Sequence, residues 1–415
     1  MYRSSPLKII LLVVLTLSCA NSNAYSVLTH EELIDLAWND SIRPLLLAKF
    51  PGATDHQLVV AHSYAYGGCA VQDMGYYPFG KRFFSNLTHY VRAGDFVSWM
   101  LRNARTLDEY AFAVGALSHY LGDSIGHAQA INPATAIEFP KLERKYGSKV
   151  TYGESPHGHI RTEFAFDVEE LRNLEFAPTA YLQAVGFRVP RRFLERAFAA
   201  TYDIDVHGVL GEHRAALRSY RTSVRSFIPA FAQAEVVLHR NQFPPQPDSD
   251  AYRIFSQRVA RTNYERRWKH TYRGPGFKAH LLAIVVFLVP KIGAASDVAI
   301  KIPTPETQEM YLRSVNHTVD RFNEILLNML QDANDPISLP NLDLDTGKPS
   351  TFGDYPLADN TYAKFIERII AKPRRTISKE LKQHILEYYG NFADGNEPTL
   401  ERLTLFQQMK VRDDR

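Results

Sequence analysis

The segment HYLGDSIGH, residues 119–127, places two histidines and one aspartate at intervals of four residues. Because an α-helix turns by about 100° per residue, His119, Asp123 and His127 would form one slowly winding line on a helix. Small and apolar residues surround this line, so we expect it to face the interior. Buried imidazole and carboxylate groups without partners would cost several kcal/mol. A metal cation is the partner that suits all three side chains.

Further candidate ligands flank this segment. His159 and Glu163 lie four residues apart on one face of a predicted helix, Asp73 lies in an aromatic loop, and His89 lies near the start of the next predicted helix. His30 lies in the first turn of the first predicted helix. A single histidine is more often a core or surface residue than a ligand, but these eight residues form an ordered series without cysteine. Such a set suits zinc, with iron or manganese also compatible by ligand type, and eight ligands imply two or three ions.

The N-terminus has the pattern of a secretory signal peptide. Arg3 and Lys8 lead into the apolar run IILLVVLTLSCA, which is too short to span a membrane, and small residues follow it. Cleavage after Ala24 would make Tyr25 the first residue of a secreted or periplasmic protein. Lipidation of Cys19 is the alternative, although the preceding TLS is a poor match to a lipobox.

The composition carries no strong signature of nucleic-acid binding. The 415 residues carry 48 basic and 45 acidic side chains, a net charge of +3, and loss of the signal peptide would reduce this to about +1. A near-neutral chain lacks the strongly basic character of proteins that bind nucleic-acid backbones. Cys69 would be the only cysteine left, so no intramolecular disulfide is expected.

Helical periodicity dominates the chain, and strand patterns are weak, which predicts an all-α fold. The candidate ligands would be positioned by helices over about 85–104, 107–130 and 157–172, with a further helix over 203–240. Downstream, the apolar run HLLAIVVFLVP is too short to cross a bilayer. A core helix is the favoured interpretation of this run, and contact with a membrane surface is the alternative.

The ordered series resembles the zinc-dependent phospholipase C family, whose relatives include the S1/P1-type nucleases. The resemblance covers roughly residues 25–167. The matching motifs are HYLGD followed by His127, Ala128 and Asn132, the earlier pair Asp73 and His89, and the later pair His159 and Glu163. The resemblance implies a multi-helix phospholipase C/P1 nuclease-like domain that binds two to three zinc ions.

The family pattern also implies a role for each ligand. One zinc would be held by Asp73, His89, His119 and Asp123, and a second by His127, His159 and Glu163. Asp123 would bridge to a third zinc, which His30 and the terminal amino and carbonyl groups of Tyr25 would also hold. Signal-peptide cleavage would therefore create a ligand, and lipidation at Cys19 would prevent its formation.

The sequence departs from the family pattern in three places. Tyr25 stands where family members usually have a tryptophan, and the spacing from Asp123 to His127 is two residues shorter than usual. The segment between His127 and His159 is longer than in compact members, which predicts a lid or a substrate-selecting loop.

The activity implied by the resemblance is hydrolysis of a phosphodiester by a zinc-activated water, with Asp73 as a ligand and candidate general base. The aromatic loop GYYPFGKRFF beside Asp73 could contact a lipid or choline-like cation, stack nucleic-acid bases, or simply pack on the core. Near-neutral charge favours a phospholipase C that removes a phospholipid headgroup. A nuclease or nucleotidase and a non-catalytic zinc- or lipid-binding module are the alternatives, and no obligate protein partner is evident.

The predicted organisation has three parts. A signal peptide occupies residues 1–24, and the phospholipase C-like domain occupies 25–240. The proline-rich segment NQFPPQPDSD, residues 241–250, is the expected linker, and it leads to a mainly helical region, 251–415, of unknown role.

Overall fold

The computed structural model describes residues 26–211, 213–272, 275–288, 300–332, 337–371, 376–390 and 397–412. Within these ranges nearly all regular structure is helical, and the only strands, β1 (Leu342–Asp343) and β2 (Lys348–Pro349), form one short antiparallel pair. The prediction of an all-α fold is therefore confirmed. The predicted signal peptide, Cys19 and the candidate ligand Tyr25 lie outside the described residues.

The described residues before Ser223 form the following helical elements: α2 (Val27–Ala37), η1 (Trp38–Ile42), α3 (Arg43–Lys49), α4 (Asp55–Gly68), η2 (Gln72–Tyr76), α5 (Arg82–Tyr90), α6 (Ala93–Asn103), α7 (Leu107–Gly126), η3 (His127–Ile131), α8 (Asn132–Glu138), α9 (Pro140–Tyr146), α10 (Pro156–Asn173), α11 (Thr179–Val185), α12 (Arg191–Tyr202), α13 (Val206–Leu210) and α14 (His213–Thr222). The second half contains η4 (Ser223–Phe227), α15 (Ile228–His239), α16 (Asp250–Val259), α17 (Asn263–Trp268), η5 (Lys269–Thr271), α18 (Phe277–Leu288), α19 (Pro305–Gln331), α20 (Pro356–Ile370), α21 (Lys379–Tyr388) and α22 (Glu397–Gln407).

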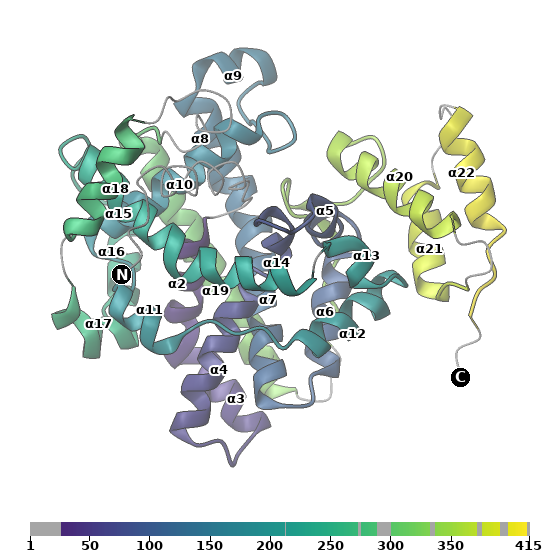
Figure 1. Cartoon of the computed structure of the whole chain (residues 1–415), viewed down its shortest axis with the longest axis horizontal. Coiled ribbons are helices and arrows are strands. Elements are labelled where there is room, and N and C mark those ends of the chain that lie inside the picture. Colours follow the sequence, from purple (N-terminus) through teal and green to yellow (C-terminus); the bar gives the residue numbers. More distant parts are fainter. Residues whose placement is uncertain are drawn as a thin grey trace, which may run out of the picture.

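Helix α7 lies at the centre of the molecule, packed most extensively against α4 (Figure 1). Glycines make the close approach of these two helices possible. A Cβ atom on Gly115 would lie 2.1 Å from the carbonyl oxygen of Ala65, and one on Gly68 would lie 2.1 Å from that of Phe112. Because the backbones touch at these positions, α7 is held rigidly along the length that carries His119 and Asp123.

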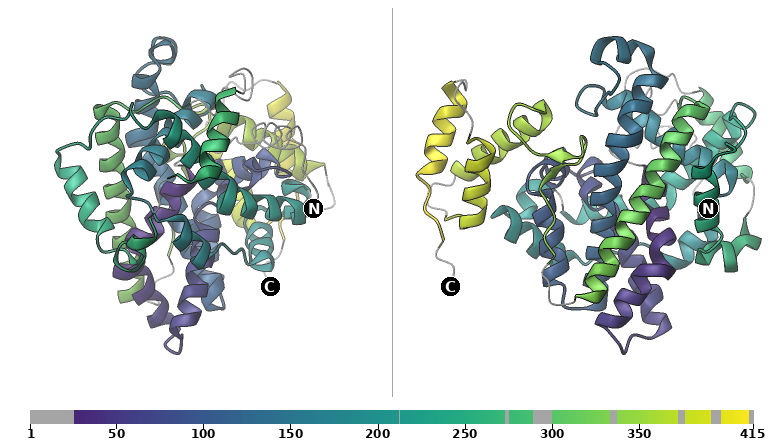
Figure 2. Two further views of the ribbon diagram at one scale, coloured as in Figure 1. Left: turned by 60° about the vertical axis from the view of Figure 1, so that its left-hand side comes forward. Right: turned by 180° about the vertical axis from the view of Figure 1, so that it is seen from behind.

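The long helix α19 also packs on α7 and contacts α2, α3 and η3, although it follows the predicted linker (Figure 2). Its buried side chains Tyr311, Leu312 and Phe322 belong to the same hydrophobic core as α4 and α7. By contrast, α20, α21 and α22 lie together at one end of the molecule, where α20 packs against α5. The division of the chain at residues 241–250 stays a prediction.

Two of the predicted helices are interrupted. The segment predicted over 85–104 forms α5 and α6, because Arg92 adopts a left-handed backbone conformation with φ of 52°. The segment predicted over 203–240 is divided among α13, α14, η4 and α15. His89 consequently lies in the last turn of α5 and not near the start of a helix. No helix in the described ranges is long and apolar enough to cross a membrane.

Candidate metal centre

The structure brings together all eight described candidate ligands, which are at most 1% exposed. They come from α7 and five other elements: His119 and Asp123 from α7, His30 from α2, Asp73 from η2, His89 from α5, His127 from η3, and His159 and Glu163 from α10. They form three groups, in each of which the potential ligand atoms lie within 4.8 Å of one another: His30, His119 and Asp123; Asp73, His89 and His119; and His127, His159 and Glu163.

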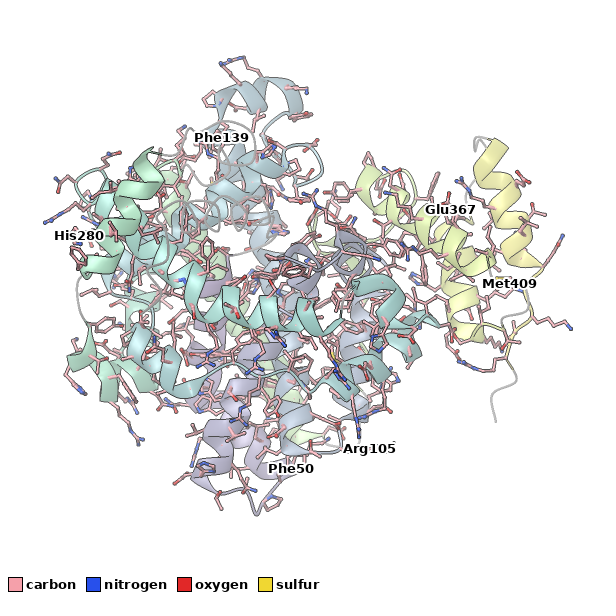
Figure 3. The ribbon with its side chains drawn as sticks, in the orientation of Figure 1. Phe50, Arg105, Phe139, His280, Glu367 and Met409 are labelled. Atoms are coloured by element: carbon pink, nitrogen blue, oxygen red, sulfur yellow. The ribbon has the colours of Figure 1, made fainter. Side chains whose placement is uncertain are left out.

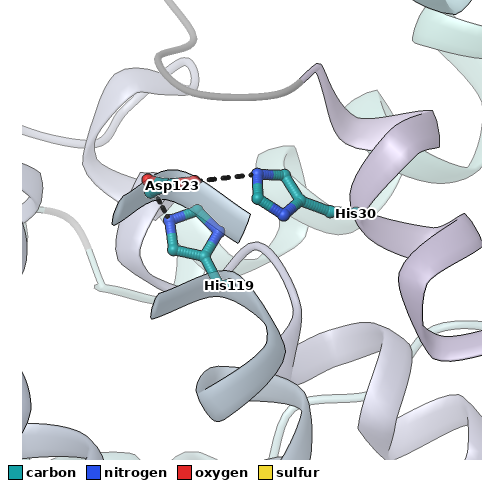
Figure 4. Close-up of side chains that lie close together, drawn as sticks. All are labelled: His30, His119 and Asp123. Atoms are coloured by element: carbon teal, nitrogen blue, oxygen red, sulfur yellow. Dashed lines mark ion pairs between the residues drawn. The ribbon is translucent and has the colours of Figure 1, made fainter. Parts of the chain in front are cut away.

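Asp123 is the centre of the first group. Its Oδ1 lies 3.2 Å from Nε2 of His30, and its Oδ2 lies 3.0 Å from Nε2 of His119 (Figure 4). Oδ2 also lies 3.1 Å from Nε2 of His89. The rings of His30 and His119 stack with their centroids 4.3 Å apart. One carboxylate therefore faces three imidazole nitrogens, an arrangement in which it can bridge two cations.

Asp73 and His89 extend this cluster. Oδ1 of Asp73 lies 3.4 Å from Nε2 of His89, which in turn lies 3.5 Å from Nε2 of His119. The second group therefore shares His119 with the first group and contacts Asp123 through both histidines.

The third group lies one turn further along the polar line of α7. Oε1 of Glu163 lies 2.9 Å from Nε2 of His159 and 3.6 Å from Nε2 of His127. At His127 the chain widens into a π-turn, in which the Asn132 N–H donates to the His127 carbonyl five residues back. Such wide turns frequently occur at functional sites. This turn carries His127 to a group separate from Asp123.

Backbone carbonyls orient three of the histidine rings. Nδ1 of His89 lies 2.7 Å from the carbonyl oxygen of Ser85. Nδ1 of His119 lies 3.0 Å from that of Cys69, and Nδ1 of His127 lies 3.0 Å from that of Leu344. A carbonyl can only accept, so each Nδ1 carries a proton, and Nε2 is the nitrogen that offers a lone pair when the ring is neutral. This is the orientation in which a metal-binding histidine is normally held.

The charges of the first two groups are strongly coupled. Burial would raise the pKa of Asp123, but the contacts with His119, His30 and His89 outweigh it and hold that pKa well below its usual range. Burial would lower the pKa of His89, but Asp123 and Asp73 raise it well above its usual value. Burial and the neighbouring His119 lower the pKa of His30. Asp123 is therefore an anion that needs several positive or polar partners.

The surroundings of His159 in the third group favour its neutral imidazole. Burial, and then the neighbouring His127, lower the pKa of His159 well below its usual value. A neutral imidazole is the form that ligates a metal ion. His159 is therefore already in its ligating protonation state at neutral pH.

The unsatisfied atoms of these groups fit zinc. Within the described part of the chain, neither carboxylate oxygen of Asp73 or Asp123 accepts a hydrogen bond of good geometry, and Nε2 of His127 and of His159 makes none. Buried polar atoms of this kind are rare in folded proteins. Nitrogen and carboxylate ligands without thiolate are compatible with zinc. The arrangement can hold closely spaced zinc ions, with Asp123 and His119 between two of them.

The aromatic loop beside Asp73 mainly packs on the core. Tyr76 and Tyr77 are buried, and the ring of Tyr77 lies 5.1 Å from that of Tyr220. Phe79 is different, because it is 67% exposed and its backbone has a positive φ of 67°. The long segment after His127 forms η3, α8 and α9, of which α9 has no buried side chain and projects from the body at the top of Figure 1. Phe139, labelled in Figure 3, lies between α8 and α9. The Arg161 guanidinium lies 4.9 Å from the centroid of its ring. A lid role for the segment between His127 and His159 stays a prediction.

Sequence reasoning missed a contribution from the C-terminal half. Leu344 and Asp345, in the turn between β1 and β2, lie directly against His127. The only local signal is the run NLDLDTG, residues 341–347, whose two aspartates are typical of any turn. A second His–Asp pair, His62 with Asp35 at 3.0 Å, was also missed and belongs to none of the three groups.

A comparison with protein families agrees with this geometry. Residues 29–209 match the family of zinc dependent phospholipase C. The matched segment contains all eight described candidate ligands and excludes Leu344 and Asp345. No curated protein and no solved structure matches the chain significantly. The three groups of ligand atoms that could hold metal ions therefore all lie within the matched residues.

Proposed function

We propose that the protein is a secreted zinc-dependent phosphodiesterase that hydrolyses phospholipids in the manner of a phospholipase C. The observation that carries the proposal is the three groups of buried ligand atoms inside the family-matched segment. Two or three zinc ions would be held there. One would be held by Asp73, His89, His119 and Asp123, and a second by His127, His159 and Glu163. A third would be held by His30 with Asp123. Bound zinc would lower the pKa of water and neutralise charge on the phosphate.

Asp73 is the residue proposed to act on water. It is 1% exposed, and its Oδ1 faces His89 at 3.4 Å. Its Oδ2 accepts no hydrogen bond in the described part of the chain. A carboxylate with one oxygen toward the ligands and the other available can orient water and accept its proton. Asp73 would therefore serve both as a ligand and as the general base.

Cleavage of the signal peptide after Ala24 is part of the proposal, because it would release Tyr25 as a further ligand beside His30. The start of α2 supports this role. The backbone N–H groups of Leu28 and Thr29 each donate to the Asp167 carboxylate at 3.0 Å, and the Thr29 hydroxyl donates to it at 2.7 Å. Asp167 on α10 thus fixes the chain immediately before His30.

The test is a substrate panel on the mature, zinc-loaded protein. We expect release of phosphorylated headgroups from phosphatidylcholine or phosphatidylethanolamine vesicles, inhibition by a chelator, and little hydrolysis of single-stranded DNA or RNA. Asp73→Asn should lose at least 100-fold in turnover, in line with the usual contribution of a general base, whereas the exposed Asp55→Asn should match the wild type. Rapid hydrolysis of nucleic acid with intact vesicles would replace this proposal with the nuclease alternative.

A further inference from the structure

The β1–β2 turn, residues 342–349, closes over the metal centre from outside the family-matched segment. The Leu344 N–H donates to the His89 carbonyl at 3.2 Å, and the Leu344 carbonyl accepts from Nδ1 of His127 at 3.0 Å. The Asn132 side chain donates to the Asp345 carbonyl at 2.7 Å. One turn of the C-terminal half therefore touches elements that carry ligands from two of the three groups.

A glycine makes this approach possible. Gly347 has a positive φ of 69°, and a Cβ atom there would lie 2.3 Å from the carbonyl oxygen of Ser124 on α7. Only glycine combines that backbone conformation with so close a contact. The turn is consequently seated on α7 beside Asp123 and cannot be a loosely attached surface loop.

The carboxylate of Asp345 is the unusual group in this turn. It is fully buried, and its Oδ1 lies 3.5 Å from Nδ1 of His127. Its Oδ2 accepts hydrogen bonds from the Tyr90 hydroxyl at 2.8 Å and the Tyr355 hydroxyl at 2.5 Å. These two hydroxyls fix the plane of the carboxylate, so Oδ1 is directed toward Nδ1 of His127, the ring nitrogen that does not face Glu163.

We propose that Asp345 is a positioning residue for the metal centre, which acts through His127. Nδ1 of His127 donates its proton to the Leu344 carbonyl, and Oδ1 of Asp345 lies 3.5 Å from the same nitrogen as a nearby negative charge. Nε2 therefore faces Glu163 with its lone pair available. A carboxylate behind a ligating imidazole also makes the imidazole a stronger donor to the metal. The inference rests on the proposed function, because it requires the group of His127, His159 and Glu163 to hold zinc. It assigns to the C-terminal half a role in completing the metal centre.

The experiment measures zinc affinity by titration with a chromophoric chelator on the full mature chain. Asp345→Asn should lower the affinity for one zinc ion, the one held by His127, His159 and Glu163, by about 10–100-fold. The affinities for the other ions should stay unchanged. Asp345→Glu should recover part of the loss, because it restores a carboxylate. The control is Asp359→Asn, since Asp359 also accepts a tyrosine hydroxyl, from Tyr388 at 2.5 Å, but lies outside the three ligand groups.

A double variant separates positioning from a structural role. In a Glu163→Gln background, in which the same ion is already lost, Asp345→Asn should change neither the remaining zinc affinities nor the melting temperature in chelator. A structural role would lower the affinities for all the zinc ions together and would lower the melting temperature in both backgrounds. That result would overturn the inference. Should Asp345→Asn fail to fold, Tyr355→Phe takes its place, because it removes one of the two hydroxyl donors to Asp345. This variant should lower the affinity for the same zinc ion to a smaller extent.

The remaining outcomes are also decisive. A zinc-loaded protein whose affinities are unchanged by Asp345→Asn overturns this inference alone and leaves the proposed function intact. A wild-type chain that holds no zinc overturns both proposals.

Discussion

Replacing Asp123 by asparagine should remove two of three bound ions and spare the third. The carboxylate lies 3.0 to 3.2 Å from Nε2 of His119, His89 and His30, so it serves the first group directly and contacts both histidines of the second. It is not a member of the group formed by His127, His159 and Glu163. Asparagine preserves the shape of the side chain and removes its charge. The expected zinc content therefore falls from about three ions per chain to about one.

The loss of stability follows from linkage. An ion present at 1,000 times its dissociation constant stabilises the folded state by about 4 kcal/mol. Losing two such ions should lower the free energy of unfolding by about 8 kcal/mol in zinc buffer, and by much less in chelator. The assays are elemental analysis of the desalted protein and denaturant unfolding under both conditions.

The reciprocal control is Glu163→Gln, which should lose only the ion of the third group. The reasoning is refuted if Asp123→Asn keeps three ions. It is equally refuted if this variant loses the ion at His127, His159 and Glu163 while retaining the others.

Three further predictions test the fold and the N-terminus. Burial raises the pKa of Glu169 from 4.5 to about 8. The folded chain therefore holds the Glu169 proton more tightly than the unfolded chain. The stability that comes from this proton is present below pH 4.5 and is lost as the pH rises toward 8. Glu169→Gln should therefore leave stability unchanged near pH 4 and raise the free energy of unfolding by about 2–5 kcal/mol at pH 9; equal effects at both pH values would contradict this. Gly115→Ala should destabilise the chain by about 1–3 kcal/mol in urea unfolding, because its Cβ would meet the Ala65 carbonyl, whereas Gly52→Ala, which meets nothing within 4 Å, should be neutral. One alanine added before Tyr25 should cost one zinc ion per chain by elemental analysis, and an unchanged zinc content would exclude the terminal amine as a ligand.

The sequence predicted those parts of the site whose residues lie close to one another along the chain. His119 with Asp123, and His159 with Glu163, are pairs four residues apart on helices, where periodicity alone places both side chains on one face. The resemblance then ordered Asp73, His89 and His30 around them. The structure brings all of these residues together.

The parts that sequence missed depend on the backbone or on distant contacts. The left-handed conformation of Arg92 divides one predicted helix, and arginine carries no local signal for such a break. The π-turn after Gly126 is likewise not encoded in hydrophobic periodicity. Asp345 approaches His127 across more than two hundred residues, and Gly347 permits this only because of where α7 lies in the folded chain. Local patterns cannot specify contacts of this kind.

The most direct test of the account is a joint measurement of zinc content and N-terminal sequence on one sample of the mature protein. The account predicts two to three zinc ions per chain with Tyr25 as the first residue. A chain that begins at Cys19, or one that carries no stoichiometric zinc, would contradict it.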